Sequence, residues 1–583
     1  MKRYRKYIRP YWKSFLLGPV LMVTEVIGEV LLPAFMANII NIGAVRHDIS
    51  YIVKMGLVML VTALVMMVGG IGGAYFSARA AISFAADLRS DVFRKVQDFS
   101  FRNVDAFSTG SLITRLTNDI TQVQNMIMMG LRLLLRAPGM LIGAVIMAFV
   151  MNPQLAVILL VVIPLLSGAI GAVIFIAYPR FEIVQKKIDA LNSRIQEALV
   201  GARIIKSFVR GSFEEEKFAR SNEELKEAGL RAFRVVILNM PIMMLAMNVT
   251  TLAVVWFGGR QVLFGTMPVG DLTAFTTYIV QVLMSLMILA MVLLQSSRAV
   301  AGLKRITEVL DTKVDLSDED ASEKEAVVSR GEIVFEDVSF SYYKGDQGGG
   351  TQAVPVLSDL SFRIEAGETV GIIGSTGCGK TSLVQLIPRL YDVDQGRVCV
   401  DGIDVREYSL RNLRDGVGMV LQKNVLFSGT IAENLRWGDE TADLDSIRMA
   451  ASCACADGFV SGFPQGYETN LSQGGVNVSG GQKQRLCIAR ALLKKPRILI
   501  LDDSTSAVDT ATEAEIRRCF AEEFRDTTKI IIAQRITSVM DADKIIVMEE
   551  GRIAAIGTHE ELLAGCDAYR EIHESQMSRE VSA

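Results

Sequence analysis

Six apolar stretches alternate with polar connections in the first half of the chain. They lie roughly at residues 15–43, 55–79, 128–151, 155–178, 236–264 and 272–296. An apolar helix of about 20 residues is long enough to cross the hydrocarbon core of a bilayer. The pattern therefore predicts an α-helical membrane domain with six transmembrane helices, embedded in a lipid bilayer.

The connections between these stretches differ in length and in charge. Three are short and carry almost no Lys or Arg, whereas two longer ones, 80–127 and 180–235, have helix-like patterning and many basic residues. The basic residues in question are Arg89, Arg94, Lys95, Arg102, Arg115, Lys186, Lys187, Arg203, Lys206 and Arg210. Because Lys and Arg concentrate on the cytoplasmic side of membrane proteins, we expect a multi-pass protein of the plasma membrane with both termini and the long connections in the cytoplasm.

A different pattern begins after the last apolar stretch. Residues 311–330, "DTKVDLSDEDASEKEAVVSR", are acidic and polar and are interpreted as a linker. Short β-rich runs then alternate with amphipathic helices, which is typical of an α/β domain built from βαβ units. The expected organisation is a membrane domain at 1–310, a linker at 311–330 and a second domain at 331–583. Residues 345–352 are expected to form a flexible loop between two strands.

Composition agrees with one membrane half and one soluble half. Of the 583 residues 50% are hydrophobic, and the mean hydropathy is +0.33, between the values typical of soluble and of fully lipid-embedded chains. The formal charge of −3 gives no reason to expect a nucleic-acid partner. All seven cysteines lie from Cys378 onward without CxxC spacing, so we expect reduced thiols and no disulfide.

A phosphate-binding loop is present in "ETVGIIGSTGCGKTSLVQLI". Gly374, Gly379, Lys380 and Thr381 have the spacing GxxxxGK[ST] between an apolar strand and a helix. Glycines allow backbone N–H groups to close around phosphates, the lysine supplies a positive charge, and the threonine hydroxyl coordinates Mg²⁺. The residues predicted to bind ATP here are Gly374, Ser375, Thr376, Gly377, Cys378, Gly379, Lys380, Thr381 and Ser382.

The stretch "RILILDDSTSAVD" supplies the second half of a nucleotide site. Four apolar residues lead into Asp502, as expected for a buried strand that delivers a carboxylate to Mg²⁺. Together with the phosphate loop, it predicts a site for ATP with Mg²⁺.

Between these motifs lies "NVSGGQKQRLCIARAL". Ser479, Gly480, Gly481 and Gln482 match the signature of the ATP-binding cassette (ABC) exporters, and the resemblance covers nearly the whole chain. It implies a half-transporter in which six membrane helices are fused to one P-loop NTPase cassette. In this family two cassettes pair head to tail, and each ATP lies between the phosphate loop of one chain and the signature of the other.

Other segments are similar to the same family. Tyr342 sits where the family stacks an aromatic ring on adenine, and Gln422 where a glutamine senses Mg²⁺. The stretch 506–509, ending in Asp509, resembles the loop that touches the partner cassette. Residues 108–120 look like the first cytoplasmic loop, and 195–208 like the second.

The chain departs from the family at two positions near the γ-phosphate. Family members that hydrolyse ATP well carry glutamate after the magnesium aspartate, but Asp503 stands here. One methylene fewer withdraws the carboxylate by about 1.5 Å, and a displacement of about 1 Å can cost around a hundredfold in rate. The family's switch histidine is replaced by Gln534, which cannot take up a proton as imidazole can. A third departure, Gln473 where many relatives have glutamate, has no assigned effect.

These departures resemble the degenerate chain of heterodimeric multidrug-type exporters. The resemblance implies an ABC-type ATPase subunit whose own site binds ATP but hydrolyses it poorly. Its intact signature would then serve a second, different half-transporter. The expected activity is export of lipophilic or amphiphilic compounds. Two alternatives remain open: a slow homodimeric exporter or lipid flippase, and a regulatory membrane protein gated by ATP.

Two acidic residues lie inside the first apolar stretch. Glu25 and Glu29 are four residues apart and therefore share one helical face. Charges within a membrane span are costly and usually face a cavity or a partner. They are interpreted either as a binding or translocation surface that favours cationic amphiphiles, or as a pair that is held by interhelical hydrogen bonds or lies near the outer interface.

Overall fold

The structure is a computed structural model that describes residues 3–318, 321–342, 355–504 and 508–580. It divides into two compact units. The helical unit comprises residues 1–97 and 109–311, and the cassette unit comprises residues 98–108 and 312–583. The predicted loop at 345–352 and Ser506–Ala507 lie outside the described residues.

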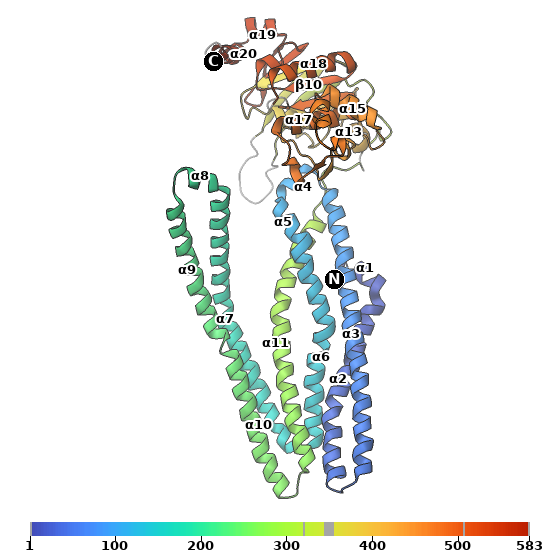
Figure 1. Cartoon of the computed structure of the whole chain (residues 1–583), viewed down its shortest axis with the longest axis vertical. Helices are drawn as coiled ribbons and strands as arrows, with labels where there is room; N and C mark the ends of the chain where they lie inside the picture. Colours follow the sequence, from blue (N-terminus) through green and yellow to red (C-terminus); the bar gives the residue numbers. More distant parts are fainter. Residues whose placement is uncertain (1–2, 319–320, 343–354, 505–507, 581–583) are drawn as a thin grey trace. The chain divides into compact units, whose positions relative to one another are not determined.

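The helical unit consists of long helices joined by short turns (Figure 1). Its elements are α1 (Arg5–Ile8), η1 (Arg9–Tyr11), α2 (Trp12–Asn38), η2 (Ile39–Ala44), α3 (Ile49–Gln97), α5 (Thr109–Thr114), η3 (Arg115–Asp119), α6 (Ile120–Met151), α7 (Pro153–Val200), α8 (Ala202–Ser207), α9 (Gly211–Val236), α10 (Asn239–Leu263) and α11 (Val269–Asp311). Within the described residues, six helical stretches are long and apolar enough to cross a membrane. The predicted six-helix membrane domain is confirmed.

Small residues allow the helices of this unit to approach closely. A side chain at Gly73 of α3 would lie 2.6 Å from the Cε atom of Met22 on α2, so only glycine fits there without rearrangement. Small residues at helix contacts are typical of membrane bundles, because they let backbones pack against each other. On α11, the Tyr278 hydroxyl donates to the carbonyl of Val30 on α2 at 2.8 Å, which satisfies a buried polar group.

The two long connections are helical. The first continues α3 to Gln97, and the second is a hairpin of α7 and α9 with α8 across its end (Figure 1). Apolar side chains are exposed near this end, namely those of Leu199, Val200, Ile204, Phe208 and Val209.

The cassette unit contains three β-sheets. Its strands are β1 (Ile333–Phe340), β2 (Leu357–Ile364), β3 (Thr369–Gly374), β4 (Gln395–Val400), β5 (Ile403–Asp404), β6 (Val417–Val420), β7 (Gly429–Thr430), β8 (Asn470–Leu471), β9 (Ile498–Asp502), β10 (Thr528–Ile532), β11 (Lys544–Glu549) and β12 (Arg552–Gly557). The sheet orders are β12-β11-β3-β10-β9-β6, β2-β1-β4-β5 and β7-β8. In the first sheet all neighbouring strands are parallel except β11 and β12. β9 and β10 are buried at every residue, as expected for the middle of a parallel sheet covered on both faces.

Helices flank these sheets. They are α4 (Phe101–Ala106), α12 (Lys380–Leu386), α13 (Leu410–Gly416), α14 (Ile431–Leu435), α15 (Leu444–Cys453), α16 (Asp457–Ser461), η4 (Gly466–Glu468), η5 (Gln473–Gly475), α17 (Gly480–Leu493), α18 (Thr510–Glu523), η6 (Ile536–Ser538), α19 (His559–Gly565) and α20 (Asp567–Glu580). One hydrophobic core lies between the two larger sheets around α12, and a second joins α15, α17 and α18 to the other face of the six-stranded sheet. The predicted α/β P-loop domain is confirmed.

The short helix α4 belongs to the cassette unit, although its chain neighbours belong to the helical unit. Ser100 and Asn103 form a capping box that begins the helix. The Asn103 amide donates to the carbonyl of Lys313 at 3.2 Å, and the Tyr391 hydroxyl donates to Asp105 at 2.9 Å. These contacts tie residues 98–108 to the segment that follows residue 311, whereas the adjoining α5 and η3 lie in the helical unit.

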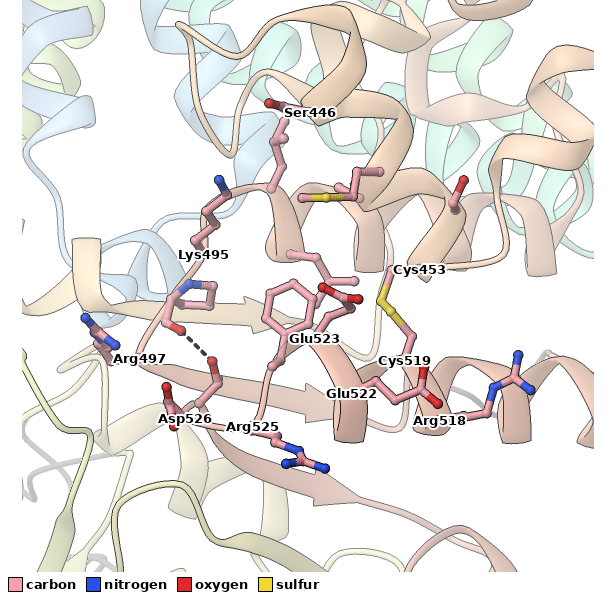
Figure 2. Close-up of a pocket in the computed structure, with 18 of the residues that line it drawn as sticks. Ser446, Cys453, Lys495, Arg497, Arg518, Cys519, Glu522, Glu523, Arg525 and Asp526 are labelled. Carbon is pink, nitrogen blue, oxygen red and sulfur yellow. Dashed lines mark hydrogen bonds between the residues drawn. A yellow bond between two sulfur atoms is a disulfide. The ribbon is translucent and has the colours of Figure 1, made fainter.

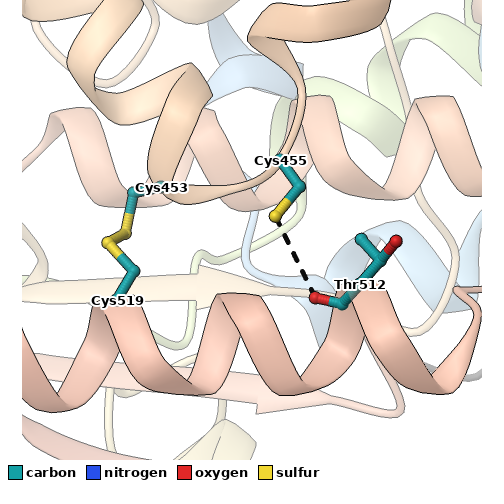
Figure 3. Close-up of a disulfide and its surroundings, with 4 residues drawn as sticks. All are labelled: Cys453, Cys455, Thr512 and Cys519. Atoms are coloured by element: carbon teal, nitrogen blue, oxygen red, sulfur yellow. Dashed lines mark hydrogen bonds between the residues drawn. A yellow bond between two sulfur atoms is a disulfide. The ribbon is translucent and has the colours of Figure 1, made fainter.

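The expectation that every cysteine is a reduced thiol is wrong for this structure. Cys453 at the end of α15 and Cys519 in α18 form a disulfide (Figure 3). The two cysteines are 66 positions apart, so no local spacing in the sequence predicts that they pair. In the folded cassette unit their Cα atoms are 5.5 Å apart, within the usual range for a disulfide. The other five cysteines are free thiols: Cys378, Cys399, Cys455, Cys487 and Cys566.

Candidate functional site

The predicted phosphate loop connects β3 to α12 in the cassette unit. A side chain at Gly374 would lie 2.1 Å from the Met548 carbonyl oxygen, and Gly379 has a φ of 99°, so both positions require glycine. The Lys380 ammonium donates to the carbonyls of Gly374 at 2.8 Å and Ser375 at 2.9 Å. These two hydrogen bonds hold the lysine ammonium against the loop. The remaining predicted residues, Thr376, Gly377, Cys378 and Ser382, lie in the same loop and at the start of α12.

Thr381 and Asp502 converge from α12 and the end of β9. The threonine hydroxyl donates to Asp502 Oδ1 at 3.1 Å. Asp502 is 1% exposed, and its Oδ2 atom has no hydrogen-bond partner among the described residues. Burial raises the pKa of this carboxyl, and the neighbouring charge of Asp503 adds to the effect. A cation would relieve both costs, so the pair fits Mg²⁺, which binds a few protein oxygens and keeps its waters or phosphates. No cluster of three or more His, Cys, Asp or Glu suited to a metal occurs in the described residues.

Asp503 and Gln534, the two departures near the γ-phosphate, contact each other. The Gln534 amide donates to Asp503 Oδ2 at 2.7 Å. The amide of Gln422 reaches the same oxygen at 3.5 Å, so Gln422 contacts Asp503. All three predicted residues therefore meet at one carboxylate oxygen.

The backbone around this group is held by residues that the sequence did not single out. Asp503 has a φ of 48°, uncommon for a residue other than glycine, and its N–H donates to the Ile532 carbonyl at 3.0 Å. The Gln484 amide donates to the Asp503 carbonyl at 3.3 Å, and the Gln576 amide to the Gln534 carbonyl at 2.8 Å. Gln484 lies in the same stretch as the signature residues, but nothing in the sequence indicates that it contacts Asp503, and Gln576 lies in no motif.

Tyr342, the predicted adenine-stacking residue, lies in an aromatic group near the phosphate loop. Its hydroxyl is hydrogen-bonded to that of Ser382 at 2.8 Å. Its ring meets that of Tyr391 edge-on, with centroids 5.2 Å apart. Burial, reinforced by the hydrogen bond to Asp105, holds the pKa of Tyr391 above its usual value. A chain of contacts thus runs from α4 through Tyr391 to Tyr342.

The signature residues begin α17. The Ser479 hydroxyl accepts from the Gln482 N–H at 3.2 Å, and the Gln482 side chain accepts from the Ser479 N–H at 3.0 Å. Ser479 and Gly480 are exposed, while Gly481 and Gln482 are half-buried. Among the described residues no hydrogen bond joins this group to the phosphate loop. The signature is therefore presented outward at a helix N-terminus, where backbone N–H groups and the helix dipole favour an anion.

Asp509 begins the next helix, α18. Its carboxylate accepts from the Thr512 N–H at 3.0 Å and from the Thr512 hydroxyl at 2.9 Å. These hydrogen bonds hold the pKa of Asp509 below its ordinary value, so it is ionised at neutral pH.

In the helical unit, Glu25 and Glu29 of α2 share a cationic partner. Arg136 of α6 lies 3.3 Å from Glu25 and 3.1 Å from Glu29. The Gln281 amide donates to the Glu29 carbonyl at 3.0 Å and adds α11 to the cluster. Arg136 was not among the residues predicted from the sequence. Its position inside the apolar stretch 128–151 was a signal, because a charge in a span needs a partner.

A helical unit with six potential membrane spans and an α/β unit with a phosphate loop define an ATP-driven membrane transporter. Family models agree: residues 15–286 match the ABC transporter transmembrane region, and residues 357–506 match the ABC transporter model. The chain belongs to the ABC transporter family and has the architecture of an exporter half-transporter.

Relatives and a solved structure match along almost the whole chain. An uncharacterized ABC transporter ATP-binding protein, YfiB of Bacillus subtilis (strain 168), is 39% identical over 585 residues, covering 100% of both chains. An ATP-dependent lipid A-core flippase of Syntrophus aciditrophicus (strain SB) is 31% identical over 598 residues, covering 99% of this chain and 95% of the relative. The structure of a bacterial Atm1-family ABC exporter with ATP bound aligns with a TM-score of 0.78 and 25% identity, covering 97% of this chain and 98% of the other.

Proposed function

We propose that this chain is one subunit of a heterodimeric ATP-driven exporter of amphiphilic compounds, and that its own nucleotide site hydrolyses ATP poorly. The observation that carries the proposal is the hydrogen bond between Gln534 and Asp503. In hydrolytic family members the position of Asp503 holds the water-polarising glutamate, and the position of Gln534 holds the switch histidine.

The geometry at Asp503 disfavours hydrolysis in two ways. Its carboxylate is one methylene shorter than that of glutamate, so it reaches less far toward an attacking water. In addition, Oδ2 is already engaged by the amide of Gln534 at 2.7 Å, which leaves that oxygen less available to a water. Gln534 cannot provide the proton exchange of an imidazole.

The binding half of the site is intact by contrast. Thr381 and Asp502 would hold Mg²⁺, Lys380 would meet the phosphates, and Tyr342 offers a ring for the base. When bound there, Mg²⁺ would supply positive charge that neutralises part of the phosphate charge. These residues support tight binding of ATP, and none of them is needed for its hydrolysis only.

The outward-facing signature supports a role for this chain at a partner's ATP. Ser479 and Gly480 are exposed at the N-terminus of α17, which is capped by the side chains of Ser479 and Gln482. The exposed apolar side chains near α8 also favour a second subunit, because soluble surfaces rarely gather such residues without a partner. We expect the partner to be a half-transporter that carries the glutamate and the histidine. Both termini and both cassettes would then lie on the cytoplasmic side of the plasma membrane.

The helical unit supports an amphiphilic substrate. Glu25, Glu29 and Arg136 form a charged cluster within a segment otherwise suited to lipid, and such clusters usually mark a substrate path or a structural ion pair. Two carboxylates and one guanidinium leave a formal charge of −1, so a cationic head group can still be attracted. The sequence similarity to a lipid A-core flippase supports a substrate with lipid-like apolar parts.

A homodimeric lipid flippase is the second candidate, and the same relative favours it. In a homodimer both sites would contain Asp503 and Gln534, so turnover would be slow and would need no other chain. A regulatory protein gated by ATP would bind the nucleotide without turnover in any assembly. ATPase activity of the purified chain, measured alone and with candidate half-transporter partners, separates the three.

The decisive experiment compares two substitutions in the reconstituted heterodimer. Ser479→Ala removes a donor for the partner's γ-phosphate and is expected to lower turnover by about a hundredfold. Lys380→Ala is expected to reduce ATP occupancy at this chain's site, measured with a photoreactive ATP analogue, while most of the turnover remains. Equal losses of turnover from the two changes would contradict the heterodimer proposal.

A further inference from the structure

The disulfide between Cys453 and Cys519 joins two helices with different tasks in the cassette unit (Figure 3). α15, which ends at Cys453, packs against α17, the helix that begins with the signature. α18, which contains Cys519, is capped by Asp509 and begins at Thr510, shortly after Asp502 and Asp503. The bridge therefore connects the element that supports the signature to the one that follows the magnesium aspartate.

The bridge lies in the wall of a cavity. Both cysteines line a cavity of about 770 Å³ between α15, the end of α17 and α18 (Figure 2). The cavity wall also carries four basic and four acidic side chains: Lys495, Arg497, Arg518, Arg525, Glu515, Glu522, Glu523 and Asp526. A polar cavity of this size admits a small thiol that carries charged groups, and the disulfide forms part of its wall.

A third cysteine nearby, Cys455, is a free thiol. Cys455 lies two residues after Cys453, and its thiol points toward the Thr512 carbonyl at 4.0 Å (Figure 3). Burial, with the negative charge of Glu515 nearby, raises the pKa of Cys455 to about 11. At neutral pH it stays protonated, and a protonated thiol is a poor nucleophile for disulfide exchange. Cys455 is therefore not expected to exchange with the Cys453–Cys519 disulfide. A substitution of Cys455 offers a matched control for substitutions of the two bridged cysteines.

We propose that Cys453 and Cys519 form a reversible redox lock that slows the ATP-driven cycle of this transporter when the bridge is closed. On closure the two thiols lose two protons and two electrons, and a new S–S bond forms between them. The electrons and protons pass to the disulfide of a small thiol or of a dithiol protein, which becomes two thiols. Opening is the reverse exchange.

The physical reason for slowing is the loss of relative freedom between α15 and α18. A cross-link closing a loop of 66 residues removes conformations that the open chain can visit. The cycle requires the signature to close on a nucleotide and to release it, so any change in the spacing of these helices would be opposed by the bridge. Disulfides found in thiol-rich compartments are commonly transient or redox-sensing, and a cassette in the cytoplasm would be such a case.

The first test measures the bridge without using transport or ATP hydrolysis. The full chain is equilibrated with mixtures of reduced and oxidised glutathione, or with a reduced or oxidised thioredoxin-like protein, and its thiols are counted by mass after maleimide labelling. We expect two thiols to disappear together in the unmodified chain and in Cys455→Ser, but not in Cys453→Ser or Cys519→Ser. Failure to form the pair at any ratio with either reagent would overturn the proposal, whatever the protein transports.

The second test measures the effect of the bridge on ATP turnover, and this part rests on the proposed function. In the assembly that hydrolyses ATP, oxidation is expected to lower the rate several-fold, with recovery on reduction. Cys453→Ser and Cys519→Ser should be insensitive, whereas Cys455→Ser should respond like the unmodified chain. An equal rate of ATP hydrolysis before and after the disulfide forms would overturn the proposal that the bridge slows the cycle. A loss that persists in Cys453→Ser would also overturn it, since it would come from another thiol such as Cys378 in the phosphate loop.

Discussion

Two carboxylate clusters, one in each unit, are held by different chemistry. In the cassette unit, Asp503 is met by the neutral amides of Gln534 and Gln422. In the helical unit, Glu25 and Glu29 are met by the guanidinium of Arg136. Counting only these residues, each cluster has a formal charge of −1: one acid in the first, and two acids with one base in the second.

The difference lies in how much of the negative charge is compensated. Amide donors solvate a carboxylate but leave its charge in place for a cation or a water. An arginine between two carboxylates cancels one of them, which matters most where the surroundings are apolar. We therefore expect the cassette cluster to control reactivity and the helical cluster to control stability first and substrate preference second.

The largest expected effect comes from removing the cation of the helical cluster. Arg136→Gln leaves two carboxylates without their charged partner and should destabilise the helical unit by roughly 3 kcal/mol. The measurement is the thermal unfolding of the full chain in detergent. Arg132→Gln is the matched control, because Arg132 lies one turn earlier on α6 and is exposed. Adding Glu25→Gln and Glu29→Gln to Arg136→Gln should recover most of the loss. Equal destabilisation by the two arginine variants would show that the cluster does not stabilise the fold.

The next effect concerns reactivity at the cassette cluster. Asp503→Glu together with Gln534→His should raise hydrolysis at this site by about tenfold, because groups that act as a unit are strongly non-additive. The measurement is single-turnover hydrolysis in a heterodimer whose partner glutamate is replaced by Gln, so that only this site reports. The single changes serve as controls and should do little. A large gain from Asp503→Glu alone would mean that reach was the whole defect and that Gln534 is an adequate switch.

The smallest expected effect concerns substrate preference at the helical cluster. Glu25→Gln with Glu29→Gln changes its formal charge from −1 to +1. Two unit charges, each about 8 Å from a head group in a water-filled path, together contribute about 1 kcal/mol, so transport of a cationic amphiphile should fall about fivefold. Neutral and anionic compounds with the same apolar tail are the controls, and each rate is normalised to folded protein. An unchanged ratio between cationic and neutral compounds would make the glutamates purely structural.

The parts of the fold and of the site that could be predicted from the sequence are those that depend on local sequence patterns. Six apolar stretches specify the membrane helices because length and apolarity alone decide whether a helix can span a bilayer. The phosphate loop needs glycine at Gly374 and Gly379 for steric reasons, so its spacing is visible in the chain. Asp503 and Gln534 were noticed because a family pattern supplies the expected residue at each position.

The parts that sequence could not predict depend on contacts between distant segments. Nothing local links Arg136 to Glu25, because the partners sit on α6 and α2 and meet only when the helices pack. The pairing of Cys453 with Cys519 likewise arises from the packing of α15 on α18. Gln484 and Gln576 support Asp503 and Gln534 through the chain's tertiary arrangement. In each case the sequence allows many possible partners for a residue, and the folded structure determines which partner it contacts.

The position of α4 also has a consequence for biosynthesis. Residues 98–108 are made early, but their partners, among them Lys313 and Tyr391, follow only after residues 109–311 have been synthesised. Domains generally fold as units while the chain emerges, and contacts between distant segments form late. The contacts of α4 with Lys313 and Tyr391 therefore form only after the C-terminal part of the chain has been synthesised. A ribosome that stalls within α6–α11 would leave α4 without its partners, as an unfinished surface that quality-control proteases could recognise.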